Sequence, residues 1–288
     1  MFRVAVVGAT GAVGGTMLRV LEERGFPVTE LRPLASSRSA GRELEYLGRP
    51  ATVRELTDDA FEDIDVALFS AGATRSRAFA PAAVEAGAVV IDNSSAYRMD
   101  PAVPLVVPEV NEEALAGHAG IVANPNCVAA PLVVALKPIL DAAGLERVIV
   151  SSYQAVSGSG LTGVDELDKQ VREVGDQSAT LTHDGHTVQF PAPEKYVRPI
   201  AFNVVAIAGS LVDDGSGETD EEQKLRRESR KILDIPELAV SGTCVRVPVF
   251  TGHSLSINAE FARPLSAERA SELLADAPGV VMTEVPNP

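Results

Sequence analysis

The stretch FRVAVVGATGAVG at residues 2–14 decides the fold class of this chain. Its valine-rich start, Phe2–Val7, has the apolar run of a strand that is covered on both faces. Glycines recur through Gly8–Gly14, and a helical pattern runs over Val13–Glu23. Glycines between a strand and a helix permit a tight turn and let a pyrophosphate approach the helix N-terminus. We therefore predict a dinucleotide-binding turn, with close packing of the helix on the strand as the alternative interpretation.

The remainder of the first 127 residues repeats this alternation. Further strands and helices are predicted over Asp65–Ser70, Ala78–Ala86 and Ala88–Asp92. Such a rhythm is typical of βαβ units on a parallel sheet. Residues 1–127 are therefore predicted to form a Rossmann-type, doubly wound parallel-sheet domain of the α/β class.

After Cys127 the pattern changes to that of an α+β domain, which we place over residues 128–288. An apolar helix is predicted over Val128–Ala143, and strands over Arg147–Val156, Leu238–Phe250 and Ser254–Ala262. The last two stretches have the pattern of antiparallel strands open to solvent on one face, so a mostly antiparallel sheet is expected. The charged segment Asp213–Lys231 is predicted to hold a solvated helix with i,i+4 charge pairs.

The composition excludes several classes of protein. Forty acidic residues against 25 basic ones give a net charge of −15, which disfavours nucleic acid as a partner because no clustered basic face is present. The two cysteines cannot build a disulfide framework, so a reducing cytoplasm is the expected location. The N-terminus lacks the pattern of a signal peptide, and no apolar run is long enough to span a membrane.

The region after the second predicted strand bears on the choice of cofactor. NAD binding usually involves an acidic residue there, which holds the ribose hydroxyls, but this chain has Leu34-Ala-Ser-Ser-Arg-Ser39. Hydroxyl groups beside Arg38 suit a 2′-phosphate, so NADP is predicted in preference to NAD. The alternative interpretation of Arg38 is a solvated loop arginine.

A candidate nucleophile lies where the second domain begins. Cys127 ends the sequence Asn-Pro-Asn-Cys and starts an apolar helix, a position that favours a thiolate. A buried structural cysteine is the alternative. His253 is the candidate base, although only tertiary folding joins it to Cys127. Cys244 is expected in the core, and no metal site is expected because the other histidines lack ligand companions.

At this point the residues resemble the aspartate-β-semialdehyde dehydrogenase family over nearly the whole chain. The resemblance rests on the following segments, in this order: GATGAVG at Gly8, SSRSAG at Ser36, DNSSAYRMD at Asp92, VPEVN at Val107, NPNC at Asn124, SYQAVSGSG at Ser152, EEQK at Glu221 and RVPVFTGHS at Arg246. It implies NADPH-dependent reductive dephosphorylation of L-aspartyl-4-phosphate to L-aspartate 4-semialdehyde, through a thioester on the catalytic cysteine.

The resemblance also implies a role for each site residue. Cys127 is the nucleophile, His253 the acid/base catalyst, and Gln154 orients the substrate. The substrate-binding residues are Arg246 for the α-carboxylate, Glu221 for the amino group, and Arg98, Asn126 and Lys224 for the phosphate. The NADP contacts are Gly8, Thr10, Gly11, Ala12, Val13, Gly14, Ser36, Ser37, Arg38, Ser39, Ser157 and Gly158.

Partners and location follow from the same resemblance. Residues 1–127 become an NADP-binding domain, and residues 128–288 become a substrate-binding, catalytic and dimerisation domain. A cytoplasmic homodimer is expected, with no nucleic acid or membrane partner. Its place is in the biosynthesis of amino acids made from aspartate, namely lysine through diaminopimelate, methionine, threonine and isoleucine.

Two other functions remain open on the sequence. N-acetyl-γ-glutamyl-phosphate reductase is a related enzyme, but it usually carries NPGC where this chain has NPNC at residues 124–127. A catalytically impaired NADP-binding protein is the second alternative. Family members continue for about fifty residues beyond residue 288, longer than an ordinary loop. We expect weaker NADP binding and lower stability in a chain without that segment than in a longer form.

Overall fold

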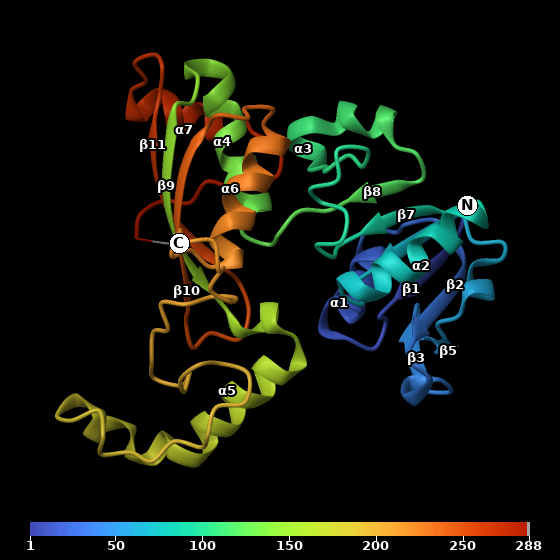
Figure 1. Ribbon diagram of the computed structural model, residues 1–288, viewed down its shortest axis with the longest axis horizontal. Coiled ribbons are helices and arrows are strands. Elements are labelled where there is room, and N and C mark those ends of the chain that lie inside the picture. Colours follow the sequence, from blue (N-terminus) through green and yellow to red (C-terminus); the bar gives the residue numbers. More distant parts are fainter. Residues whose placement is uncertain (287–288) are drawn as a thin grey trace. The chain divides into compact units, whose positions relative to one another are not determined.

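A computed structural model describes residues 1–286 and divides the chain into two compact units (Figure 1). The first unit holds Met1–Asn126 together with Glu228–Pro236. The second holds Cys127–Arg227 and the chain from Glu237 onwards. This division differs from the expected boundary in two respects: Cys127 belongs to the second unit, and a short segment late in the sequence belongs with the first.

The first unit is built on a parallel sheet with the strand order β5-β2-β1-β6-β7-β8. Its strands are β1 (Phe2–Val7), β2 (Val28–Ala35), β5 (Arg54–Glu55), β6 (Val66–Phe69), β7 (Val89–Asp92) and β8 (Ile121–Ala123). The order reverses direction between β1 and β6. Ligands of open α/β sheets bind at such a switch point, at the carboxyl ends of the strands.

Helices cover both faces of this sheet, as the alternating side chains of β1 show. Ala5 and Val7 pack in one buried cluster with Ala80 and Ala83 of α2 (Ala73–Glu85). Val4 and Val6 face the other way and pack with Leu18 of α1 (Ala12–Glu23). The remaining elements of the unit are the hairpin β3 (Glu43–Tyr46) and β4 (Arg49–Thr52), helix α3 (Pro108–Asn111) and the short 3₁₀ helices η1 (Ser37–Ser39), η2 (Asp58–Phe61) and η3 (Glu112–Gly117).

The second unit is built on a three-stranded sheet with the order β10-β9-β11. Its elements are α4 (Ala129–Ala143), β9 (Arg147–Gln154), η4 (Val156–Ser159), α5 (Leu161–Val174), η5 (Gly175–Thr182), α6 (Asp220–Ile232), β10 (Ala239–Arg246), β11 (Ser254–Glu260) and α7 (Ala267–Ala275). One face of β9 is buried, whereas Ile149 and Tyr153 on the other face are exposed, as the half-buried pattern predicts.

Together these sheets confirm the predicted fold class, a doubly wound parallel-sheet domain followed by an α+β domain. The pairing of β10 differs from the expectation. Strand β11 runs antiparallel to β9, but β10 runs parallel to it. A parallel neighbour needs a long crossover connection, and the chain between β9 and β10, which includes α5 and α6, supplies one.

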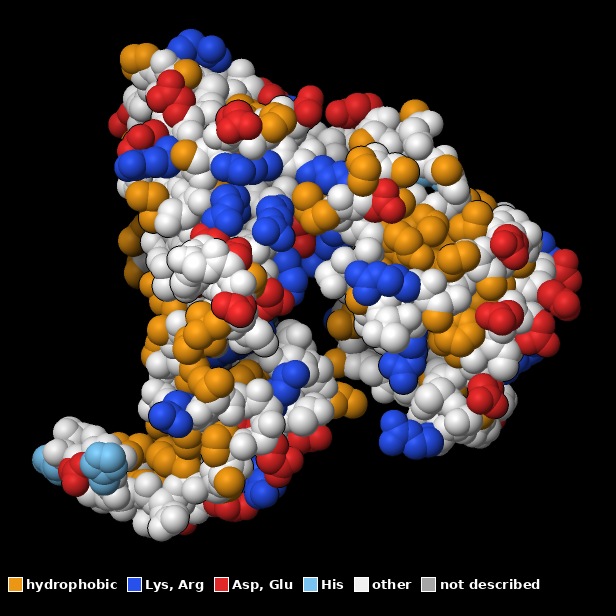
Figure 2. Space-filling model, in the orientation of Figure 1, with side chains coloured by type: hydrophobic (Ala, Val, Ile, Leu, Met, Phe, Trp, Pro, Cys, Tyr) orange, Lys and Arg blue, Asp and Glu red, His pale blue; other side chains and the backbone are white. Residues whose placement is uncertain are grey.

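Helix α6 lies in the charged segment that was expected to be solvated, and this expectation is wrong. Glu221, Leu225, Glu228 and Ser229 are all buried. The helix begins with a capping box, in which Thr219 and Glu222 exchange hydrogen bonds between side chains and main-chain N–H groups. In the space-filling view, Lys and Arg side chains gather where α6 lies in Figure 1 (Figure 2). The helix therefore buries carboxylates among polar partners, and among its basic side chains only that of Arg227 is exposed.

The C-terminal part of α6 explains the unexpected membership of residues 228–236 in the first unit. Lys231 Nζ donates hydrogen bonds to the main-chain carbonyls of Arg98, Asp100 and Val103 at 2.9, 2.7 and 2.8 Å. Glu228 forms an ion pair with Arg98. None of the helices within residues 1–286 has the length and apolar character needed to cross a lipid bilayer.

Candidate active site

The structure pairs the candidate nucleophile with the candidate base, although 126 residues separate them in sequence. Cys127 is exposed just before α4, and its Sγ lies 3.2 Å from His253 Nε2. His253 follows Gly252, whose φ of +84° is a left-handed conformation that favours glycine. It precedes β11, and the antiparallel pairing of Ser254 with Tyr153 brings it to the end of β9.

The other ring nitrogen fixes the tautomer of His253. Nδ1 accepts a hydrogen bond from the main-chain N–H of Ala155 at 3.0 Å, so the neutral ring carries its proton on Nε2. Burial lowers the pKa of His253, and the positive charge of Arg246 lowers it further. A neutral His253 therefore directs an N–H donor at the sulfur of Cys127, so in this tautomer it is a donor to the nucleophile and not the base that the sequence suggests.

Gln154 and Arg246 lie next to each other because they end two parallel strands in the same register, β9 and β10. Gln154 is fully buried and donates from Nε2 to Glu221 Oε1 at 3.1 Å. Its Oε1 has no hydrogen-bond partner within the described chain, so the buried amide can accept one from a ligand. Arg246 donates from Nη1 to the carbonyl of Ala155 at 3.2 Å.

Arg246 also faces a pocket of about 250 Å³ within the second unit. Its lining consists of Gly158, Ser159, Lys195, Tyr196, Val197, Ile207, Gly209, Ser210 and Arg246. A Cβ atom at Gly158 would lie 3.3 Å from Arg246 Nη1 and 3.4 Å from His253 Nε2. Glycine at this position therefore leaves room beside both groups. The volume suits a ligand of amino-acid size, smaller than a drug-sized molecule.

Lys224 and Glu221 occupy neighbouring turns of α6, as their i,i+3 spacing predicts. Lys224 Nζ donates a hydrogen bond to Asp220 and lies 3.5 Å from Glu221 Oε2. Burial opposes the charge on Lys224, but the hydrogen bond to Asp220 and the charges of both carboxylates outweigh it and raise the pKa of the ammonium group. Lys224 therefore stays a cation beside Glu221.

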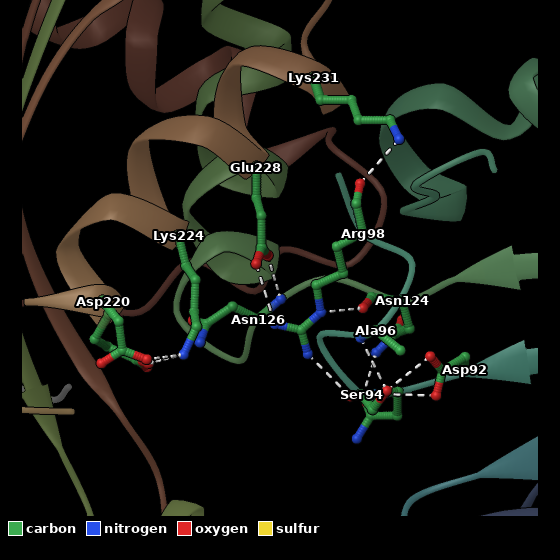
Figure 3. Close-up of polar contacts among 12 residues, drawn as sticks. Asp92, Ser94, Ala96, Arg98, Asn124, Asn126, Asp220, Lys224, Glu228 and Lys231 are labelled. Atoms are coloured by element: carbon green, nitrogen blue, oxygen red, sulfur yellow. Dashed lines mark hydrogen bonds and ion pairs between the residues drawn. The ribbon is translucent and has the colours of Figure 1, made fainter. Parts of the chain in front are cut away.

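Arg98 and Asn126, two residues to which the family resemblance gives a role in phosphate binding, lie in the first unit and share one carboxylate partner (Figure 3). Arg98 Nη1 donates to Glu228 Oε1 at 3.1 Å, and the main-chain N–H of Asn126 donates to Glu228 Oε2 at 2.5 Å. Asn126 is joined to Cys127 by the peptide bond, so this contact lies one residue from the candidate nucleophile.

The turn between β1 and α1 has the geometry that a dinucleotide requires. A Cβ at Gly14 would lie 2.2 Å from the carbonyl oxygen of Gly8, so only glycine allows α1 to pack this closely on the strand. Gly8 has a φ of +87°. The first turn of α1 contains no acidic residue, which leaves its N-terminus suited to a phosphate. Ser36–Ser39 follow β2 at the same edge, and Arg38 among them is exposed.

The predicted site residues divide between the two units. The first unit holds Gly8, Thr10, Gly11, Ala12, Val13, Gly14, Ser36, Ser37, Arg38, Ser39, Arg98 and Asn126, and the second holds Cys127, Gln154, Ser157, Gly158, Glu221, Lys224, Arg246 and His253. Cys244, which we expected in the core, is fully buried. Within the described residues, no group of three or more His, Cys, Asp or Glu side chains could hold a metal ion.

Sequence reasoning missed several residues of this site. The main-chain N–H of Ala155 donates to His253, and its carbonyl accepts from Arg246. The identity of a side chain does not predict such main-chain contacts. Lys195 and Tyr196 line the pocket from an irregular loop. Glu228 lies seven residues after Glu221, and this spacing, which places both on one helix face, is a signal that could have found it.

Two family models together match most of the chain. The model described as "Semialdehyde dehydrogenase, NAD binding domain" matches residues 3–118, and the one described as "Semialdehyde dehydrogenase, dimerisation domain" matches residues 136–288. The two matches fall on the parallel-sheet unit and on most of the α+β unit, respectively.

Individual relatives agree with these models. The chain is 58% identical to aspartate-semialdehyde dehydrogenase of Streptomyces akiyoshiensis over 287 residues, covering 99% of this chain and 84% of the relative. A crystal structure of aspartate semialdehyde dehydrogenase II from Vibrio cholerae, complexed with ASA, superposes with a TM-score of 0.91 at 42% identity, covering 100% of this chain and 84% of the other.

A more distant structure shares the fold and was solved with a nucleotide. Aspartate semialdehyde dehydrogenase with NADP from Candida albicans has a TM-score of 0.69 at 27% identity, covering 96% of this chain and 76% of that chain. Since a family model matches more than half of the residues and the relatives are aligned over nearly the full sequence, the chain belongs to the aspartate-semialdehyde dehydrogenase family.

Proposed function

We propose that this aspartate-semialdehyde dehydrogenase converts L-aspartyl-4-phosphate, NADPH and a proton into L-aspartate 4-semialdehyde, inorganic phosphate and NADP. The observation that carries this proposal is the contact between Cys127 Sγ and His253 Nε2 at 3.2 Å, in the unit that also holds Arg246 and its pocket. A thiol held by a histidine beside an anion-binding arginine suits covalent catalysis on a small acidic substrate.

Cys127 forms and breaks the covalent bond in this scheme. Its thiolate sulfur attacks the acyl carbon, the bond between that carbon and the phosphate oxygen breaks, and phosphate leaves with both bonding electrons and takes up the proton of the overall equation. The resulting thioester is reduced by a hydride, which NADPH supplies when bound. The carbon–sulfur bond then breaks, and the semialdehyde leaves.

His253 assists through its Nε2–H group. Because Nδ1 is occupied by the N–H of Ala155, Nε2 is a donor, and its hydrogen bond stabilises negative charge on Cys127 before attack and again when the sulfur leaves. The main-chain N–H groups at the start of α4 follow Cys127 directly, and such groups suit the oxyanion of the tetrahedral intermediates.

Three side chains of the second unit suit the amino-acid end of the substrate. The fork of Arg246 matches an α-carboxylate, and the buried carboxylate of Glu221 matches an ammonium group. Oε1 of Gln154 has no hydrogen-bond partner among residues 1–286, and the same ammonium group can donate to it. Arg98, Asn126 and Lys224 are proposed to bind the phosphate group.

NADP is the proposed cofactor. The turn at Gly8–Gly14 would take the pyrophosphate, and Ser36–Ser39 would take the 2′-phosphate in place of the acidic residue that NAD needs. Ser157 and Gly158 are proposed near the nicotinamide, since Gly158 adjoins His253. The Candida albicans relative solved with NADP supports this choice.

A cytoplasmic homodimer is proposed for the assembly. The dimerisation-domain model matches residues 136–288, and the open face of the second sheet exposes Ile149 and Tyr153 at 42% and 43%. Apolar side chains gathered on one sheet face suit an isologous contact between two copies. The product's chemistry places the reaction in the biosynthesis of amino acids that derive from aspartate.

The test is NADPH formation from aspartate semialdehyde, with NADP and phosphate omitted in turn. Activity should require both, and Cys127→Ala should abolish it, while Cys244→Ala should retain it as a matched control. Activity without phosphate would contradict the acyl-phosphate scheme, and activity of Cys127→Ala would contradict the thioester.

A further inference from the structure

The geometry points to Glu228 as a positioning residue for phosphate: its one carboxylate holds both Arg98 and the main chain of Asn126. The inference rests on the proposed function, because that proposal makes these two residues phosphate ligands. Glu228 itself lies in none of the motifs that carry the family resemblance.

The carboxylate of Glu228 is 1% exposed, and its two oxygens accept hydrogen bonds from two different residues (Figure 3). Oε1 accepts from Arg98 Nη1 at 3.1 Å, and Oε2 accepts from the N–H of Asn126 at 2.5 Å. A buried carboxylate is stable only when paired and hydrogen-bonded, and these two contacts contribute to holding it there. One side chain therefore joins the loop that carries Arg98 to the residue before Cys127.

The remaining bonds of Arg98 fix the plane of its guanidinium group. Nε donates to the carbonyl of Asn124 at 2.9 Å, and Nη2 donates to the carbonyl of Asn93 at 2.9 Å. These bonds and the one to Glu228 engage three of the five N–H groups that a guanidinium carries. Each Nη atom carries one further N–H group, and a phosphate oxygen is a suitable acceptor for it.

A glutamine at position 228 would fill the same volume but could not replace the carboxylate. Two N–H donors, one from Arg98 and one from Asn126, approach the two oxygens. An amide offers one oxygen and one NH₂ group, so one of the donors would face another donor and lose its bond. Either Arg98 or Asn126 would move, and phosphate binding would weaken in both cases.

Lys231 provides a matched control from the next turn of the same helix. Its Nζ binds the carbonyls of Arg98, Asp100 and Val103, and so it holds the same loop. None of these bonds involves the guanidinium of Arg98 or the main chain of Asn126. Lys231→Met should therefore loosen the loop and lower the melting temperature without a specific effect on phosphate.

The experiment measures NADPH formation at varied phosphate for the wild type, Glu228→Gln and Lys231→Met. We expect the KM for phosphate to rise at least tenfold in Glu228→Gln while the KM for NADP stays within twofold. In Lys231→Met the KM for phosphate should stay within twofold. An unchanged phosphate KM in folded Glu228→Gln, or an equal rise in Lys231→Met, would overturn the inference.

Two other outcomes of this experiment have their own interpretation. If the wild type needs no phosphate, the proposed function fails rather than the role of Glu228. If Glu228→Gln does not fold, Glu228→Asp takes its place: it keeps both acceptor oxygens but withdraws them by one bond length, about 1.5 Å. Its phosphate KM should rise at least threefold, and a wild-type value would refute the role.

Discussion

Replacing Gly14 by alanine should damage the first unit and its nucleotide site, whereas the same change at Gly15 should not. The added Cβ at Gly14 would lie 2.2 Å from the oxygen of Gly8, 2.8 Å from its carbonyl carbon and 2.7 Å from the Cα of Ala9. All three atoms belong to the backbone, so no side-chain rotation relieves the overlap. At Gly15, one residue further along the same helix, a Cβ would meet nothing within 4 Å.

The size of the effect follows from these distances. A carbon–oxygen contact of 2.2 Å must open by about 1 Å to reach van der Waals contact, which is overpacking of the kind that costs about 1–3 kcal/mol. A destabilisation of 1 kcal/mol lowers the melting temperature by about 2–4 °C in a domain of about 150–250 residues. Gly14→Ala should therefore lower the melting temperature by about 2–12 °C. Gly15→Ala should instead stabilise the helix by about 0.5–1 kcal/mol.

The assay combines thermal melting, followed by circular dichroism, with titration of NADPH. Moving the Gly8–Gly14 turn displaces the N–H groups that we propose for the pyrophosphate, so NADPH affinity should fall at least about tenfold, or about 1.4 kcal/mol. Gly15→Ala should bind NADPH as the wild type does. Wild-type stability and NADPH affinity in Gly14→Ala would refute the close approach of α1 to β1 and the role of this turn.

Three further predictions concern the second unit. Burial raises the pKa of Cys244 to about 11, so iodoacetamide at pH 8 should label Cys127 alone, and mass spectrometry of the labelled peptides would reveal a contrary result. The pKa of His253 is lowered below its ordinary 6.5 by burial and by Arg246, so the unfolded chain binds the proton more readily and stability should fall as pH drops below about 6.5. The melting temperature of His253→Asn should fall less between pH 8 and pH 5.5 than that of the wild type, and an equal fall would contradict this. Arg246→Lys keeps the charge but loses the fork, so the KM for aspartate semialdehyde should rise about tenfold while the KM for NADP is unchanged.

The parts of the fold that the sequence predicts are those that depend on local pattern. The valine run Phe2–Val7, the glycine turn and the helix after it each have a signature within a few residues, and the structure has all three. The direction of β10 lacks such a signature, because a half-buried strand alternates in the same way whether its neighbour is parallel or antiparallel. The connection between the strands decides it, and that connection contains α6.

In the candidate site, too, the sequence predicts features that depend on residue type and does not predict those that depend on tertiary structure. Cys127 and His253 are recognisable as residue types with suitable neighbours, but they lie 126 residues apart in sequence. Their contact depends on the pairing of β11 with β9. The tautomer of His253 depends on one main-chain N–H, that of Ala155, whose side chain has no part in it. Positions of main-chain donors follow from the fold alone, so residue types cannot reveal them.

Helix α6 shows how a charged helix can be buried without losing its charges. Glu221, Lys224, Glu228 and Lys231 recur at intervals of three and four residues, which places them along one face. Apolar residues at this spacing are normally used to identify the buried face of a helix. Charged residues at the same spacing are normally interpreted as a solvent-exposed face. Each of these charges has its own hydrogen-bonded or ionic partner, from Gln154 for Glu221 to three carbonyls for Lys231. Removing a charge from water costs too much free energy unless the charge has such partners. Charged residues that recur every three or four positions can therefore mark a helix face that packs against the rest of the protein.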